Sequence, residues 1–370
     1  MKLADVTLRE GDQMPGRTYE PEAKIEAGRA LDDLGVTYLQ AGFPATGEAD
    51  RRVVSTLAAE TNADVVGLSR ALPGDVEATL DADADVVEVF APLGDHHLKH
   101  VLGKTREEAL TALREAIDRA NEAGVEAHVS LLDGFRTDLE HVRRAFDAFP
   151  DVAYVTLADT VGVRTPREVA DRLTLLSADV DLSRAGVHFH DDLGVATANV
   201  LTAADIGAGK ADVSVAGLGE RAGNAPLEEV VVGSTLADGD PFGVDPDRIV
   251  PTCEAVLAVL DESVPDRKAV LGRDATTHES GLHTAAMLDD SSTFEPYPPE
   301  RFGGTRRLVF GAGTGRGAAR RLLERAGIDA EPDGVKALLA ALAEEGPIET
   351  DAALELARRT VGAADEGADG

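Results

Sequence analysis

Asp85-Val86-Val87-Glu88-Val89-Phe90 is a short apolar run that predicts a buried strand, and Val125–Leu131 is a second run of the same kind. Between them, Thr105–Gly124 carries Leu113 and Ile117 at helical spacing on one face. A strand, a helix and a second strand in this order favour two parallel strands joined by a right-handed crossover. The sequence therefore predicts a strand–helix–strand unit with parallel strands, and the fold can be built from repeats of this unit.

The same alternation extends in both directions along the 370 residues of the chain. Helix signals separate the apolar runs, for example Pro21 at the start of one helix and Gly35 at its end. Eight runs are expected to form strands, at Lys2–Thr7, Val36–Ala41, Asp64–Leu68, Asp85–Phe90, Val125–Leu131, Val152–Leu157, Gly186–His190 and Asp212–Ala216.

Eight strand–helix units in about 240 residues predict an α/β fold, a (β/α)₈ TIM barrel over residues 1–245. The alternative is an open doubly wound sheet, but the first strand is not followed by a glycine-rich dinucleotide turn. Residues 246–370 lose the strand–helix rhythm and are expected to form a C-terminal helical extension without a separate regulatory domain. Its helices are predicted at Asp247–Leu260, Gly317–Ala326, Asp333–Glu344 and Thr350–Val361.

Acidic residues dominate the charge of the chain. Lys and Arg number 36 against 68 Asp and Glu, which gives a net charge of −32, and the acids are spread from Asp5 to Asp369. Such a field argues against nucleic acids and anionic membranes as partners, since both require cationic patches. We hypothesise adaptation to molar salt, in which screening weakens the repulsion between carboxylates. Equal stability without salt and in molar KCl would contradict that hypothesis.

Cys253 is the single cysteine, so no internal disulfide framework is expected, and a reducing compartment is favoured. The first residues contain no apolar signal core, and no apolar run approaches the roughly 18 residues of a membrane span. We therefore expect a cytoplasmic protein.

Candidate catalytic residues are those that follow the strands, because active sites of such barrels lie at the carboxyl ends. His188 and His190, two apart on a predicted strand, project to the same face. Glu10 follows the first strand, which neighbours the eighth in a closed barrel. Two imidazoles and a carboxylate suit Mg²⁺, Mn²⁺, Co²⁺ or Zn²⁺. The competing interpretation is a pair of buried structural histidines.

Arg9 precedes the candidate ligand Glu10, and its permanent charge could stabilise an enolate or alkoxide oxygen. A structural salt bridge is the alternative role. The glycines around Glu220 in Gly217–Asn224 would allow close approach of a ligand to the backbone. Asp191 and Asp192 could support the imidazoles from behind, although an acidic surface explains them equally well.

At these residues the chain resembles the metal-dependent acyl-CoA condensing enzymes, which include isopropylmalate, homocitrate and citramalate synthases, with HMG-CoA lyase as a more distant barrel relative. The resemblance covers roughly residues 3–325. Its motifs are Leu8–Gln13, Leu157–Gly162, His188–Asp192 and Gly217–Asn224.

The resemblance implies a divalent metal, acetyl-CoA as co-substrate and a 2-oxo acid as acceptor. It implies Glu10, His188 and His190 as ligands, with Asn224 as a fourth. Arg9 would hold the carbonyl oxygen, and Gln13, His97, Arg136 and Thr160 would contact the substrate. Glu220 and His283 are both candidates for the base. In relatives the segment carrying His283 reaches into the barrel of a second copy, so the resemblance also implies a homodimer.

Four positions depart from the family pattern. Gln40 and Leu132 stand where glutamate is usual, Phe294 where tyrosine is frequent, and Gly313 where histidine is found. The first two concern the oxo-acid pocket, so no known specificity can be transferred.

Two alternatives to an acyltransferase remain open. One is a metal-dependent lyase or aldolase on the same barrel, and the other is a barrel that binds ligand without catalysis. The departures motivate the second alternative, while the presence of Arg9, Glu10, His188, His190 and Asn224 argues against it.

Overall fold

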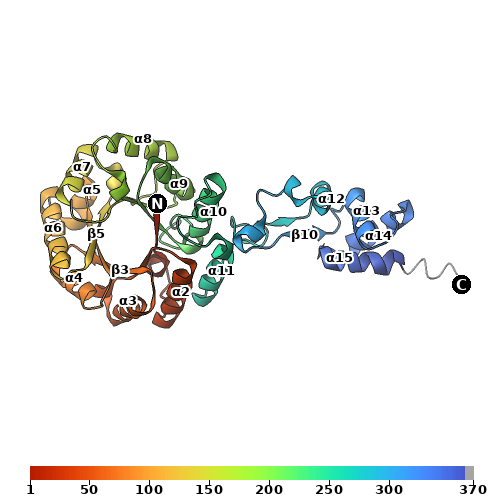
Figure 1. The fold of residues 1–370 in the computed structure, drawn as a ribbon, viewed down its shortest axis with the longest axis horizontal. Coiled ribbons are helices and arrows are strands. Elements are labelled where there is room, and N and C mark those ends of the chain that lie inside the picture. Colours follow the sequence, from red (N-terminus) through yellow and green to blue (C-terminus); the bar gives the residue numbers. More distant parts are fainter. Residues whose placement is uncertain (363–370) are drawn as a thin grey trace. The chain divides into compact units, whose positions relative to one another are not determined.

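The computed structural model describes residues 1–362 and divides into two compact units, Met1–Ser263 and Val264–Gly370. The first unit contains a closed barrel whose strands follow one another in chain order and pair in parallel, with β1 closing against β8 (Figure 1). The predicted (β/α)₈ fold is therefore confirmed. The strands are β1 (Lys2–Asp5), β2 (Tyr38–Gly42), β3 (Asp64–Arg70), β4 (Val86–Pro92), β5 (Glu126–Leu132), β6 (Val155–Asp159), β7 (Ala185–Phe189) and β8 (Lys210–Val213).

Helices surround the barrel, and their ends follow the signals in the sequence (Figure 1). The helix that begins at Pro21 ends before Gly35, whose φ of 98° closes it in the left-handed region. Thr105 caps another helix, because its hydroxyl accepts from the Glu108 N–H while the Glu108 carboxylate accepts from the Thr105 N–H. The outer helices are α2 (Pro21–Leu34), α3 (Glu48–Glu60), α4 (Pro73–Leu80), α6 (Arg106–Glu122), α7 (Leu139–Ala148), α8 (Pro166–Leu176), α9 (Ala196–Ile206) and α10 (Leu227–Ala237).

Two strand ends differ from the prediction in ways that matter for the site. The eighth strand is Lys210–Val213 rather than Asp212–Ala216, because the chain turns at Ala216, which has a φ of 56°. Asp212 is therefore near the end of its strand, at the active-site face. The seventh strand ends at Phe189, and His190 instead forms an isolated antiparallel bridge with Asn224.

Helix α11 (Ile249–Val259), which the sequence placed in the C-terminal extension, belongs to the first unit, where it packs against α2. The boundary between the compact units thus follows Ser263, while the strand–helix rhythm ends near residue 245. Within residues 1–362, no helix combines the length and apolar character needed to cross a bilayer.

The second unit is mainly helical, as expected, and also contains short strands. A three-stranded sheet in the order β11-β10-β9 lies among its helices. Phe310, Leu322, Leu338 and Leu356 are buried in its core. The elements are β9 (Thr277–His278), α12 (Gly281–Asp289), β10 (Arg307–Phe310), α13 (Arg316–Arg325), α14 (Pro332–Glu345), β11 (Ile348–Glu349) and α15 (Thr350–Ala357).

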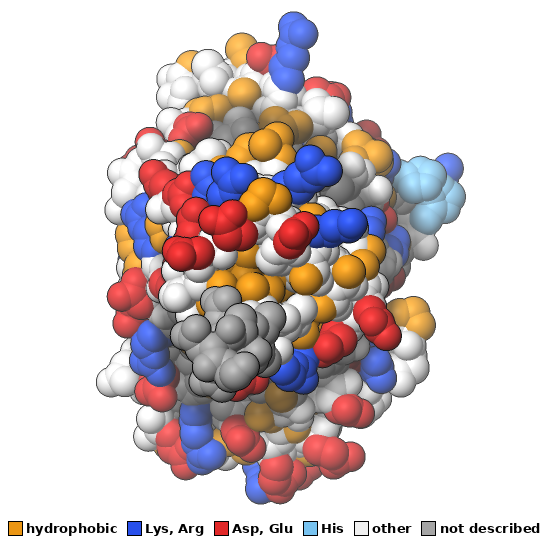
Figure 2. Space-filling view, turned by 90° about the vertical axis from the view of Figure 1, so that its right-hand side faces the viewer, with side chains coloured by type: hydrophobic (Ala, Val, Ile, Leu, Met, Phe, Trp, Pro, Cys, Tyr) orange, Lys and Arg blue, Asp and Glu red, His pale blue; other side chains and the backbone are white. Residues whose placement is uncertain are grey.

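Acidic and basic side chains alternate over short distances on the face of the molecule shown in Figure 2. Many of the basic groups form ion pairs, such as Arg321 with Asp289 and Arg306 with Glu295. On this face the carboxylates are spread out rather than gathered in one block, as the sequence predicts.

Candidate active site

A pocket of about 240 Å³ opens at the carboxyl ends of the barrel strands. Its position is the one at which (β/α)₈ barrels place their active sites. The pocket brings together most of the predicted site residues, namely Arg9, Glu10, Gln13, Thr160, His188, His190 and Glu220.

The two histidines face each other in this pocket. His188 Nε2 and His190 Nε2 are 3.5 Å apart, although the chain leaves the strand between them. His188 Nδ1 lies 3.1 Å from Asp212 Oδ2, and a carboxylate can only accept, so Nδ1 donates to Asp212 and Nε2 is left facing the pocket. Burial lowers the pKa of His190 to about 4, so this ring is neutral near pH 7.

Glu10 reaches the histidines from the short helix α1 (Thr7–Glu10) that follows β1. Its side chain is buried, and Oε1 lies 3.9 Å from His188 Nε2. Burial alone would raise the pKa of Glu10, but the charge of the Arg9 guanidinium and its hydrogen bond lower it, so the group is a carboxylate. Arg9 forms an ion pair with Glu10, and its Nε donates to Gln40 Oε1 at 2.5 Å.

Asn224 joins this group because the loop after β8 folds back beside the end of β7. The Asn224 N–H donates to the Gly217 carbonyl, and the Asp191 N–H donates to the Gly223 carbonyl. A Cβ on Gly219 would lie 2.3 Å from Asn224 Nδ2, so a glycine is required for this close approach. Asn224 Nδ2 donates to the Leu218 carbonyl at 3.3 Å, which leaves Oδ1 available as a ligand.

These four side chains fit a divalent cation by their chemistry. Within residues 1–362, Glu10 Oε2, His190 Nδ1 and Asn224 Oδ1 are buried and have no hydrogen-bond partner. Most buried polar atoms in proteins are hydrogen-bonded, so unpaired atoms on three of the four candidate ligands suggest a bound group there. In the same part of the chain, no group of three or more His, Cys, Asp and Glu side chains is already arranged to hold a metal. The Arg9–Glu10 ion pair would have to rearrange for the carboxylate to become a ligand.

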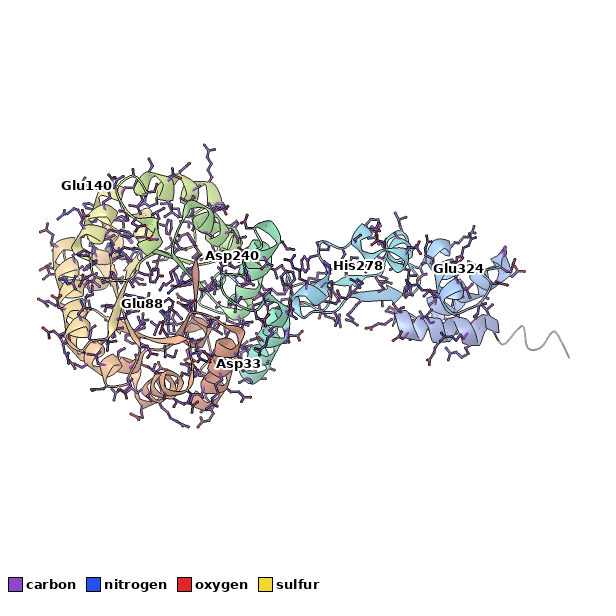
Figure 3. All side chains as sticks on the ribbon, viewed as in Figure 1. Asp33, Glu88, Glu140, Asp240, His278 and Glu324 are labelled. Atoms are coloured by element: carbon purple, nitrogen blue, oxygen red, sulfur yellow. The ribbon has the colours of Figure 1, made fainter. Side chains whose placement is uncertain are left out.

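A buried polar network lies beneath the pocket. Glu88 points into the barrel (Figure 3), where Oε1 accepts from Ser130 Oγ at 2.6 Å and Oε2 accepts from Gln40 Nε2 at 2.7 Å. The Lys210 ammonium is fully buried, at 3.3 Å from Glu88 Oε1 and 3.4 Å from Asp212 Oδ1. This network connects Arg9, through Gln40, with the carboxylate that orients His188.

Lys210, Glu88 and the role of Asp212 were missed in the sequence. The signal that could have found two of them is the spacing of Lys210 and Asp212, which are two apart on one strand and therefore share its inner face. The carboxylate that supports an imidazole is Asp212, not the expected Asp191 or Asp192. Asp191 Oδ1 accepts from the Ala196 N–H, and Asp192 forms an ion pair with Arg221.

His97 and Arg136 are not brought into the pocket that contains Glu10. Both contact Asp133, whose Oδ2 lies 3.1 Å from His97 Nδ1 and whose Oδ1 accepts from Arg136 Nε at 2.5 Å. Arg136 lines a separate cavity of about 360 Å³. The Asp133 N–H donates to Thr160 Oγ1 at 2.8 Å, so Asp133 connects this cavity with the pocket.

The two candidate bases lie in different units. Glu220 lines the pocket with a half-exposed carboxylate that is 3.3 Å from Arg221 Nη1. His283 lies on α12 of the second unit, where its ring stacks on Phe294 with centroids 3.9 Å apart. Phe294 thus takes a packing role beside the candidate base.

Comparisons with known proteins agree with the class that the barrel and its site define. The HMGL-like family model matches residues 1–251, and the model for the homocitrate synthase post-HMGL domain matches residues 270–347. The chain belongs to the HMGL-like family and is an enzyme of its homocitrate, isopropylmalate and citramalate synthase group.

Relatives with different names are about equally similar to this chain. Homocitrate synthase AksA of Methanopyrus kandleri is 39% identical over 96% of this chain and 91% of its own length. The (R)-citramalate synthase CimA of Methanocaldococcus jannaschii is 33% identical over 94% of this chain and 71% of its own. The HMG-CoA lyase structure from Bacillus subtilis has a TM-score of 0.64 at 22% identity, covers 71% of this chain and 95% of that one, and supports the fold alone.

Proposed function

We propose that this enzyme is an acyltransferase that condenses acetyl-CoA with a 2-oxo acid and hydrolyses the resulting thioester. The observation that carries the proposal is the convergence of Glu10, His188 and His190 beside Arg9 in one pocket of a barrel of this family. Asn224 lies next to this group through its backbone bridge with His190. The product would be a 2-hydroxy-dicarboxylate, and free coenzyme A would be released.

Glu10, His188, His190 and Asn224 are the proposed ligands of a divalent cation, with Mg²⁺, Mn²⁺, Co²⁺ and Zn²⁺ all compatible with the donor set. Such a cation supplies Lewis-acid polarisation of the keto carbonyl when bound. Asp212 holds His188 in the tautomer with Nε2 toward the pocket.

The remaining residues act on the organic substrates. Arg9 is at the edge of the ligand group and stabilises negative charge on the former carbonyl oxygen. Thr160 lines the same pocket and would contact the oxo-acid carboxylate, whereas Gln13 lies at its exposed mouth. His97 and Arg136 would contact a substrate only if it extended into the cavity beside Asp133.

A base removes a proton from the acetyl methyl group, and the resulting enolate carbon attacks the keto carbon. The alkoxide formed is then protonated, and water cleaves the thioester to a carboxylate and the coenzyme A thiol. Glu220 is the carboxylate in the pocket that could accept the first proton. His283 is the alternative base, and we propose that a second copy of the chain in a homodimer supplies it.

The test is an assay for free thiol in molar KCl with Mg²⁺ or Mn²⁺. Thiol release from acetyl-CoA should require an added 2-oxo acid. His190→Ala should abolish turnover, whereas the matched variant His100→Ala, at an exposed position in Leu98–Leu102, should retain it. Thiol release that is independent of every oxo acid tested, or its complete absence with a folded protein, would contradict the proposal.

A further inference from the structure

The wall of the pocket that lies across the barrel from the ligand group is apolar. Leu68 on β3, Phe90 on β4 and Leu132 on β5 line this wall. In the closed barrel these strands lie on the side opposite β7, β8 and β1, which carry or precede the candidate ligands. Phe90 is held in place by an edge-to-face contact with Phe43, with ring centroids 6.0 Å apart. A substrate whose keto group meets the ligands therefore extends its side chain toward this wall.

The polar side chains that line the pocket beside this wall, Ser130 and Gln40, are already engaged with buried partners. Ser130 donates its hydroxyl hydrogen to Glu88, and Gln40 uses its amide oxygen for Arg9 and its amide nitrogen for Glu88. The Lys210 ammonium lies between Glu88 and Asp212, two carboxylates, and has no exposure to the pocket. A second carboxylate on the substrate would compete with these internal pairs rather than find a free donor.

The charged residues that line the pocket also disfavour a second carboxylate on the substrate. Among the described lining residues, Arg9 carries the permanent positive charge, while Glu10, Asp212 and Glu220 carry carboxylates. Arg9 is itself paired with Glu10. A bound divalent cation would cancel the net negative charge of these lining residues. One substrate carboxylate could then lie beside the cation, but no positive charge would be left for a second carboxylate at the apolar wall. Burying an unpaired carboxylate is costly.

We infer that the side-chain subsite formed by Leu68, Phe90 and Leu132 selects an aliphatic monocarboxylic 2-oxo acid and rejects a dicarboxylic one. The inference rests on the proposed function for the identity of the reaction. It concerns a different property, because it states which acceptor binds, and binding can be measured without acetyl-CoA.

The first experiment is calorimetric titration of the Mn²⁺-loaded protein in molar KCl with 2-oxoisovalerate, pyruvate and 2-oxoglutarate. We expect an aliphatic acid to bind about 100-fold more tightly than 2-oxoglutarate, because the second carboxylate would be buried without a partner. Tighter binding of 2-oxoglutarate would overturn the inference even if turnover with acetyl-CoA were confirmed. Selective binding of an aliphatic acid without any thiol release would keep the subsite and reject the proposed function.

The second experiment changes the wall itself. Leu132→Arg places a cation beside the side-chain subsite, and we expect it to narrow the preference by lowering the Kd for 2-oxoglutarate at least about 10-fold. Leu132→Met keeps the volume and apolar character of the wall and is the matched control that should retain the wild-type order. If Leu132→Arg remains folded and weakens the binding of every oxo acid equally, the wall does not discriminate between substrate side chains and the inference fails.

Discussion

The Asp212 carboxylate lies between two buried nitrogens, with Oδ2 at 3.1 Å from His188 Nδ1 and Oδ1 at 3.4 Å from Lys210 Nζ. Although burial acts in the opposite direction, Lys210 and His188 lower the pKa of Asp212 to about 2. The carboxylate is therefore charged at neutral pH and fixes the His188 ring with Nε2 toward the pocket.

Replacing Asp212 should weaken metal binding without removing a proposed ligand. Asp212→Asn leaves the shape of the side chain but removes the charge that selects the His188 tautomer, so we expect a loss of about 10- to 100-fold in affinity for Mn²⁺. Calorimetric metal titration measures this directly. Asp191→Asn is the matched control, since Asp191 Oδ1 accepts from the Ala196 N–H at the start of α9. Equal affinities in both variants and wild type would contradict the role of Asp212.

Gly219 should be intolerant of even one added carbon. In Gly219→Ala the Cβ would lie 2.3 Å from Asn224 Nδ2, so Asn224 must move away from the site. We expect weaker Mn²⁺ binding with a protein that still folds. Gly74→Ala on α4 meets nothing within 4 Å and should behave as wild type. An unchanged metal affinity in Gly219→Ala would show that Asn224 is not needed as a ligand.

The buried carboxyl group of Asp5 should make the free energy of unfolding depend on pH. Burial raises the pKa of Asp5 from 3.8 to about 7, despite hydrogen bonds from Thr7 that act to lower it. The folded state then holds a proton that the unfolded chain has released, so this contribution to stability is complete below the unfolded pKa and is lost as the pH rises through 7. From one unit below this pKa to one above, we expect the free energy of unfolding to fall by about 1.4 kcal/mol from this group.

The measurement is chemical unfolding at the two pH values for wild type and Asp5→Asn. The variant keeps an oxygen that can accept from the Thr7 N–H, which the wild-type Oδ1 does at 2.9 Å. Its stability should change less with pH than that of wild type. If the free energy of unfolding changes by the same amount between the two pH values in both proteins, a group other than Asp5 is responsible.

Variants of His283 can test whether a second copy of the chain supplies this residue to the active site. If a partner chain supplies His283, a mixture of Glu10→Gln and His283→Ala subunits contains sites with every required residue. We therefore expect the refolded mixture to regain activity that neither variant has alone. Full activity of His283→Ala by itself would remove His283 from the mechanism, and an inactive mixture would argue that each chain uses its own His283.

The sequence predicted most of the fold because its signals are local. Thr105 marks the start of one helix, and Pro21 and Gly35 mark the two ends of another, where the structure places them as expected. The pairing of His188 with His190 and the position of Glu10 followed from the rule that sites lie at the carboxyl ends of strands.

What the sequence did not reveal depends on contacts between distant strands. Lys210 and Glu88 are 122 positions apart, and their pairing appears only when the barrel closes. Asp212 was expected at the beginning of its strand because the turn at Ala216 was interpreted as strand, so its approach to His188 was hidden. The engagement of His97 and Arg136 by Asp133 is likewise tertiary.

The most direct test of the proposed function is the identity of the product formed from acetyl-CoA labelled with ¹³C at the methyl carbon and an unlabelled aliphatic 2-oxo acid. We predict that mass spectrometry and NMR will find the label in the methylene carbon of a new 2-hydroxy-dicarboxylate, formed together with one equivalent of free coenzyme A. Label that appears only in acetate, with no new carbon–carbon bond, would contradict the proposed condensation.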